Sequence, residues 1–140
     1  MAGLSGVVTI TNASRRPPSQ RRKGVAHGRP DAPGRPVEWA GRSGETFIHM
    51  AYALVACPEV PRANYILVER AGDGRPYVLA VGRVENAAPS LNLAHIRRRG
   101  ATLGANEVHV YVHPGNVRGR RRIEQDLKAA VSAARRRGRA

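Results

Sequence analysis

The chain has 140 residues, which is enough for one domain with a single modest hydrophobic core. Lys and Arg number 24 against 10 Asp and Glu, so the formal net charge is +14 at pH 7. Repulsion on this scale opposes a compact fold unless a polyanion neutralises it, and the composition therefore indicates nucleic acid as the partner.

The same composition excludes several other classes of protein. A membrane-surface helix pairs its basic face with Trp, Phe and Leu, but the chain has one Trp and one Phe. No apolar run is long enough to span a bilayer. The single cysteine, Cys57, excludes an internal disulfide framework and a Cys-based zinc site. We expect a cytoplasmic, nucleoid-associated protein that uses no membrane and shows no sign of an obligate protein partner.

Residues 1–44 are rich in proline and glycine and carry clusters of basic residues. Beyond a candidate short strand at Val7–Thr11, nothing in them is periodic, which is typical of a flexible arm. Such an arm would add sequence-independent phosphate contacts, for which Arg21, Arg22 and Lys23 are the candidates. A solubilising tail without a partner is the alternative. The folded, nucleic-acid-binding domain is then predicted to span residues 45–140.

The first predicted element of that domain is a helix. Ser43 is a candidate N-cap, and the prolines after residue 57 would end the helix. Four side chains recur at the i, i+3, i+4 and i+7 spacing of an amphipathic helix, namely Phe47, Met50, Ala51 and Leu54.

A hairpin is predicted next. The stretch Asn64–Arg70 is rich in residues that favour strands, and Tyr77–Val84 is a second such run. Gly72, Asp73 and Gly74 lie between them and are a strong turn signal. The two runs therefore predict antiparallel strands joined by a tight turn.

A second helix and a third strand follow. The helix is predicted over residues 90–104, where Leu93, Ile96 and Leu103 share one face. Residues 107–112 alternate, which predicts a strand. Its valines are expected to face inward, and its polar residues Glu107 and His109, with Tyr111, are expected to face outward.

The last helix is predicted over residues 118–137. Its apolar stripe consists of Ile123, Leu127, Ala130, Val131 and Ala134, and its far side carries Arg121, Arg122, Lys128, Arg135 and Arg136. The element order is then helix, strand, strand, helix, strand, helix. This order predicts an α/β (α+β) sandwich with a small three-stranded sheet flanked by helices.

Few carboxylates are available for chemistry, and Glu124 is the most promising of them. It lies at the border of the apolar stripe of the last helix, where neighbouring cations would keep it ionised. There it could bind a divalent cation beside a phosphate. The alternative is a surface Glu124 paired with Lys128 at i+4. Glu107, His109 and His113 could form another metal site, although outward-facing strand residues are the default.

The run Arg97, Arg98 and Arg99 lies on the second predicted helix. With Leu93 and Ile96 on the buried face, Arg97 and Arg99 flank that face and Arg98 points away. A flanking arginine can reach a phosphate held at the sheet and stabilise charge that develops there. The run therefore predicts nucleic-acid contact, while a solvated basic face needs no such role.

The order of these pieces resembles the GIY-YIG nuclease domain over about Asn64–Val131. Ala63-Asn64-Tyr65 stands where that family has Gly-Ile-Tyr, and Ala80-Val81-Gly82-Arg83 stands where it has Tyr-Ile-Gly followed by a basic residue. The helical arginine of the family would fall on Arg97, and its metal-binding glutamate on Glu124.

The resemblance implies metal-assisted phosphodiester hydrolysis. Tyr65 would activate or orient the attacking water, Arg97 would stabilise the charge on the phosphorus oxygens, and Glu124 would hold one Mg²⁺ or Mn²⁺. We therefore expect a DNA-binding protein, with duplex DNA favoured over RNA, that is a small metal-dependent endonuclease. The alternative is a non-catalytic DNA- or RNA-binding protein on the same scaffold. Arg83 joins Arg98, Arg99 and the basic residues of the last helix as candidate nucleic-acid contacts.

Overall fold

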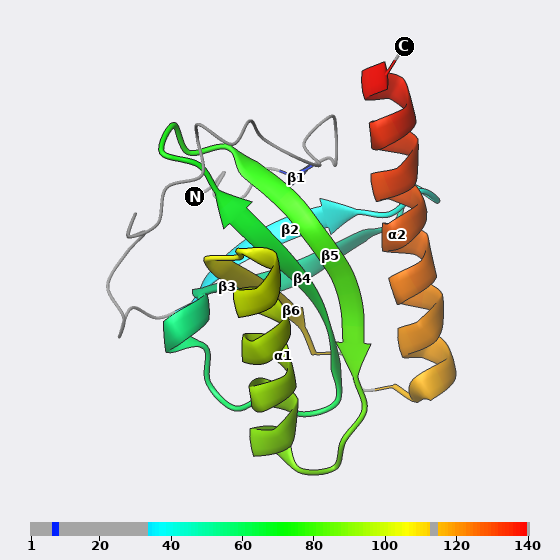
Figure 1. The fold of residues 1–140 in the computed structure, drawn as a ribbon. Helices are drawn as coiled ribbons and strands as arrows, with labels where there is room; N and C mark the ends of the chain where they lie inside the picture. Colours follow the sequence, from blue (N-terminus) through cyan, green and yellow to red (C-terminus); the bar gives the residue numbers. More distant parts are fainter. Residues whose placement is uncertain (1–6, 9–33, 113–114, 140) are drawn as a thin grey trace.

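The computed structural model describes residues 7–8, 34–112 and 115–139, and it shows an α+β fold (Figure 1). The sheet has six strands in the order β1-β2-β3-β6-β4-β5. The two-residue strand β1 (Val7–Val8) pairs in parallel with β2, and the other five strands are antiparallel. A sheet flanked by helices was predicted correctly, but the predicted number of three strands is wrong.

The segment predicted as the first helix is strand β3 (Thr46–Ala53), which pairs with β2 and β6. Its burial has a period of two: Phe47 and His49 are buried, while Ile48 is 60% exposed. Met50, which the helical interpretation placed on the buried face, is exposed. The helix prediction failed because Phe47 and Ala51 satisfy both periods, and because a buried histidine was not expected.

Strand β2 (Arg35–Ala40) lies within the region predicted as a flexible arm. It pairs with β3 along its whole length, and Trp39 is 1% exposed in the core. The folded part of the chain therefore begins before residue 45.

The predicted hairpin is confirmed as β4 (Ala63–Arg70) and β5 (Pro76–Val84). Gly74 in the turn has φ +91°, a conformation that glycine adopts readily. The register shifts between Leu67 and Val68, so Leu79 is an extra residue on β5 and forms a bulge.

Strand β6 (Glu107–Tyr111) inserts between β3 and β4. Because β6 is an inner strand of a sheet covered on both faces, Val108 and Val110 are buried on one side and Glu107 and His109 on the other. The prediction that Glu107 and His109 face outward is therefore wrong, as is the burial of Val112, which is exposed.

Buried hydrogen bonds satisfy these polar groups. Trp39 Nε1 donates to His109 Nδ1 at 2.8 Å, and His109 Nε2 lies 2.9 Å from Glu107 Oε1. Arg70 donates to both oxygens of the same carboxylate. Burial alone would raise the pKa of Glu107, but the hydrogen bonds from His109 and Arg70 outweigh it and lower the pKa to about 2.

Helices α1 (Pro89–Leu103) and α2 (Val117–Arg139) were both predicted, and they cover opposite faces of the sheet (Figure 1). One core cluster joins the apolar stripe of α2 to Ile66 and Val81. The other joins Ile96 of α1 to Tyr65, Leu67 and the short 3-10 helix η2 (Leu54–Ala56). No helix in the described ranges is long and apolar enough to cross a bilayer.

The apolar stripe predicted for α2 is confirmed, whereas α1 is rotated from its predicted face. Its buried residues are Asn92, Ile96 and Gly100, while Leu103 is exposed. Asn92 is buried because its side-chain amide donates to the carbonyl oxygens of Val60 and Asn86. This rotation decides which arginine of α1 meets the sheet.

Candidate nucleic-acid interface

The solvent side of α2 carries charge of one sign. Its apolar stripe is buried in the core, so the opposite side of the helix faces water. All exposed charged side chains described on α2 are basic, namely Arg118, Arg121, Arg122, Lys128, Arg135, Arg136 and Arg137. The predicted basic far side is thus exposed.

Both acidic residues of α2 are engaged by other residues. Oε1 of Glu124 lies 2.9 Å from Arg83 Nε, and its Oε2 lies 3.0 Å from Lys128 Nζ. Asp126 accepts hydrogen bonds from the backbone N–H and the hydroxyl of Ser43 in the β2–β3 turn, at 2.8 and 2.6 Å. Asp126 is therefore engaged by the β2–β3 turn, and Glu124 offsets only part of the positive charge, at Lys128.

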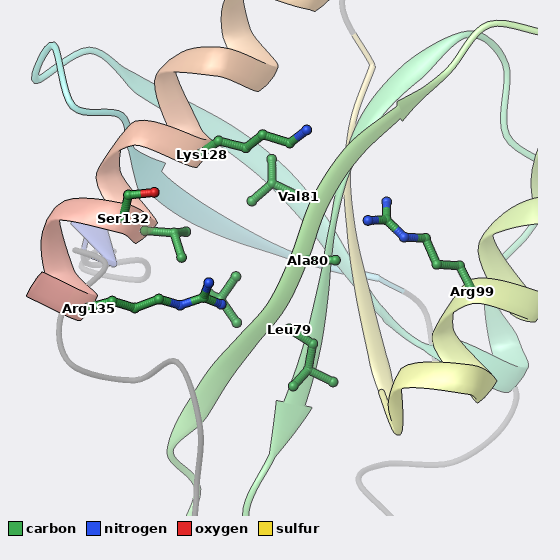
Figure 2. A pocket seen from close by; sticks show the side chains of 9 residues that line it. Leu79, Ala80, Val81, Arg99, Lys128, Ser132 and Arg135 are labelled. Atoms are coloured by element: carbon green, nitrogen blue, oxygen red, sulfur yellow. The ribbon is translucent and has the colours of Figure 1, made fainter.

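A groove of about 270 Å³ lies beside this helix, at the outer edge of β5 (Figure 2). Residues 78–81 of β5 form its floor. Arg99 of α1 stands on one side of the strand, and Lys128, Ser132 and Arg135 of α2 stand on the other. No acidic residue is among the described residues that line the groove.

Arg99 is fixed in place by Tyr65. Its Nη1 donates to the Tyr65 hydroxyl at 2.7 Å, and His95 Nε2 lies 3.4 Å from the same oxygen. A Cβ atom at residue 82 would lie 2.6 Å from that hydroxyl, so the contact requires Gly82. The guanidinium is therefore held beside the groove before any ligand arrives.

The chain matched no protein-family model, no curated protein and no solved structure. Its functional residues are therefore assigned from their own geometry.

The three residues predicted as catalytic are not brought together. Tyr65 packs in the core on the α1 side of the sheet, and its hydroxyl meets Arg99 rather than Arg97. Arg97 donates to the backbone carbonyl oxygens of residues 55 and 57. Glu124 lies on α2, against the opposite face, in its ion pairs with Arg83 and Lys128.

The donors available for Mg²⁺ or Mn²⁺ fit poorly. Both oxygens of Glu124 face cations, which a metal ion would have to displace. Within the described ranges, no three His, Cys, Asp or Glu side chains gather into a set that could hold a metal. His113 of the other candidate set lies outside these ranges.

The predicted nucleic-acid contacts divide into three groups. Most are accessible at the groove or on the helix surfaces: Arg98, Arg99, Arg121, Arg122, Lys128, Arg135 and Arg136. Arg83 is engaged with Glu124 and Glu85. Arg21, Arg22 and Lys23 lie outside the described residues.

Two contacts of the site were missed from the sequence. The Arg99–Tyr65 bond could have been suspected from Asn92, Ile96 and Gly100, since a glycine inside a helix often marks close packing. Arg120 is buried and donates to both oxygens of Glu85. Its hydrogen bonds lower the pKa of Glu85. No local pattern pointed to this second pair.

Proposed function

We propose that this protein binds nucleic acid through the phosphate backbone, using the solvent side of α2. One observation carries the proposal: every exposed charged side chain described on that helix is basic, while Glu124 and Asp126 are engaged by other residues. Such a surface attracts a polyanion along the whole length of the helix.

Arginine makes up most of this surface, which favours phosphate as the ligand. The planar guanidinium donates two parallel hydrogen bonds to phosphate oxygens and stays charged. Nothing in the arrangement selects particular base edges, so we expect binding that depends little on sequence. Duplex DNA is the first choice of partner and structured RNA the second.

We do not extend the proposal to hydrolysis. The likeness to the GIY-YIG domain rests on the order of hairpin, helix, strand and helix, and β4, β5, α1, β6 and α2 follow that order. The separation of Tyr65 from Glu124, however, gives the hydrolytic hypothesis no assembled site. Binding without cleavage is the function that this geometry supports.

Fluorescence anisotropy with a labelled DNA duplex tests the binding surface. We expect the double variant Arg121→Gln/Arg136→Gln to bind more weakly and to lower the slope of log K against log salt by about 1.8. The control Arg75→Gln removes a positive charge from the β4–β5 turn, where Arg75 pairs with Asp73, and should leave that slope unchanged. A wild-type affinity that does not change with salt would overturn the proposal.

Incubation with supercoiled plasmid tests the absence of cleavage. We expect the plasmid to shift in a gel and stay uncut with Mg²⁺, Mn²⁺ or EDTA. Metal-dependent nicking that disappears in Glu124→Ala would instead establish the nuclease and restore Glu124 as its metal ligand.

A further inference from the structure

The outer edge of β5 offers backbone hydrogen-bonding groups as well as nearby positive charge. β5 is the last strand of the sheet, and no described strand pairs with its outer side. In an antiparallel pair, alternate residues direct their N–H and C=O groups away from the neighbouring strand. The floor of the groove therefore presents backbone donors and acceptors that no described strand uses, between Arg99 and the cations of α2.

We propose that this groove holds an unpaired nucleic-acid strand, with its phosphates against Arg99, Lys128 and Arg135. The inference rests on the proposed function and names the form of nucleic acid that the groove takes. An unpaired strand offers phosphates to the cations and free base edges to the β5 backbone. In a duplex the pairing edges of the bases are already occupied by the partner strand.

The edge of β5 is poorly suited to the addition of another β-strand. The bulge at Leu79 lies in the groove floor, and bulges at sheet edges interrupt regular pairing. A second copy of the chain would bring the same cations face to face, which like-charge repulsion opposes. Nucleic acid avoids both problems because its backbone is anionic and needs no strand register.

The affinity of the groove should come mainly from phosphates. No aromatic side chain is among its described lining residues, so the bases find no stacking platform there. Arg99 contributes most per contact, because its bond to Tyr65 already fixes the guanidinium. Binding of an unpaired strand should therefore weaken as salt rises, and it should depend on Arg99.

Titration with labelled oligothymidine and a duplex of equal length tests this inference. We expect Arg99→Gln to weaken oligothymidine binding about 5–10-fold at low salt and to lower the salt slope by about 0.7. Its duplex affinity should change less than about 2-fold. Arg75 lies in the β4–β5 turn and is already paired with Asp73. The control Arg75→Gln should therefore bind oligothymidine like the wild type.

A second variant keeps the inference testable if Arg99→Gln does not fold. Ser132→Glu adds a carboxylate to the groove from the exposed side of α2 and leaves the Tyr65–Arg99 bond intact. It should also weaken oligothymidine binding, but only Arg99→Gln compares the two probes, because Ser132 lies on the side of α2 assigned to duplex binding. If Arg99→Gln weakens the two probes equally, or if neither variant weakens oligothymidine binding, the groove is not a single-strand site.

Competition separates this inference from simpler possibilities. Oligoglutamate of equal charge should displace oligothymidine poorly, and equal displacement would mean that the groove takes any polyanion, which overturns the inference. If the wild type binds neither nucleic acid, the proposed function fails as well. If duplex binding depends on α2 while Arg99→Gln has no effect, only the groove inference fails.

Discussion

At residue 82 the backbone of β5 comes so close to the Tyr65 side chain that only hydrogen fits on the α carbon. An added Cβ would lie 2.6 Å from the Tyr65 hydroxyl and 2.8 Å from Arg99 Nη1. Both atoms belong to a buried or half-buried contact that fixes Arg99 beside the groove. A single hydrogen atom thus permits the arrangement on which the groove depends.

Gly82→Ala is expected to destabilise the protein by about 1–3 kcal/mol, because the new methyl group overpacks this contact. It should also weaken oligothymidine binding, since Arg99 must move. Urea unfolding and anisotropy measure the two effects. Gly72→Ala is the control, because nothing lies within 4 Å of a Cβ there. Equal stability of the two variants would contradict the close contact.

Glu124 acts on the same groove from the other side of β5. Its carboxylate lies 3.0 Å from Lys128 Nζ and partly neutralises a cation that lines the groove. We expect Glu124→Gln to tighten nucleic-acid binding a few-fold and to cost about 1 kcal/mol of stability as Arg83 loses a charged partner. The control Asp73→Asn removes one negative charge from the β4–β5 turn and should change neither quantity appreciably. Weaker binding by Glu124→Gln would contradict this role.

At the scale of the element, β3 places a titratable side chain in the core. His49 is fully buried, its Nδ1 lies 3.0 Å from the carbonyl oxygen of Phe47, and its Nε2 has no hydrogen-bond partner among the described residues. Burial, followed by the nearby His109, lowers the pKa of His49 to about 4, although the bond to Phe47 opposes the change. The folded protein therefore keeps this ring neutral.

Stability should fall with acid as a result. Below the ordinary pKa of 6.5, the unfolded chain takes up a proton at His49 that the folded protein does not. The loss should amount to about 3 kcal/mol at most and should end near pH 4. His109, whose pKa is also lowered, contributes in the same direction. Urea unfolding at several pH values between 7 and 4 gives the free energy of unfolding at each pH. This free energy should fall less steeply with decreasing pH in His49→Leu than in the wild type, and an equal dependence on pH would contradict the prediction.

Local signals predicted the elements that have a tight turn or a continuous apolar stripe. Gly72–Gly74 specified the β4–β5 hairpin, and the apolar stripe of α2 identified its buried side. The signals misled where polar residues are buried. His49 broke the period-two pattern of β3, and Glu107 and His109 were placed outside because their partners, Arg70 and Trp39, come from distant strands.

The candidate site was predictable only in part for the same reason. The basic residues of α2 could be found from the sequence, because their helix has a clear apolar side. The convergence of Tyr65 with Arg99 was missed because it depends on a buried Asn92 that rotates α1, and Gly100 was the only sequence signal of close packing on that face of the helix. The separation of Glu124 from Tyr65 required knowing that the two helices cover opposite faces.

At the scale of the whole molecule, the net charge of +14 sets stability and binding against each other. Salt screens repulsion among the arginines and thereby favours the folded state, while it weakens attraction to phosphates. Raising NaCl from about 50 to 500 mM should increase Tm by about 2–6 °C and decrease nucleic-acid affinity over the same range. Differential scanning fluorimetry measures the change in Tm, and fluorescence anisotropy measures the change in affinity. A Tm that falls as NaCl rises would contradict the prediction.

The position of β6 has a consequence for how the chain folds as it is made. β3 and β4 follow one another in the sequence, yet β6 lies between them in the sheet and is synthesised after both. Until β6 emerges from the ribosome, the two hairpins have no strand to join them, and each leaves open an edge that is later buried. The nascent chain therefore passes through a period in which it can pair with other chains, and that period closes only when the last strand is inserted.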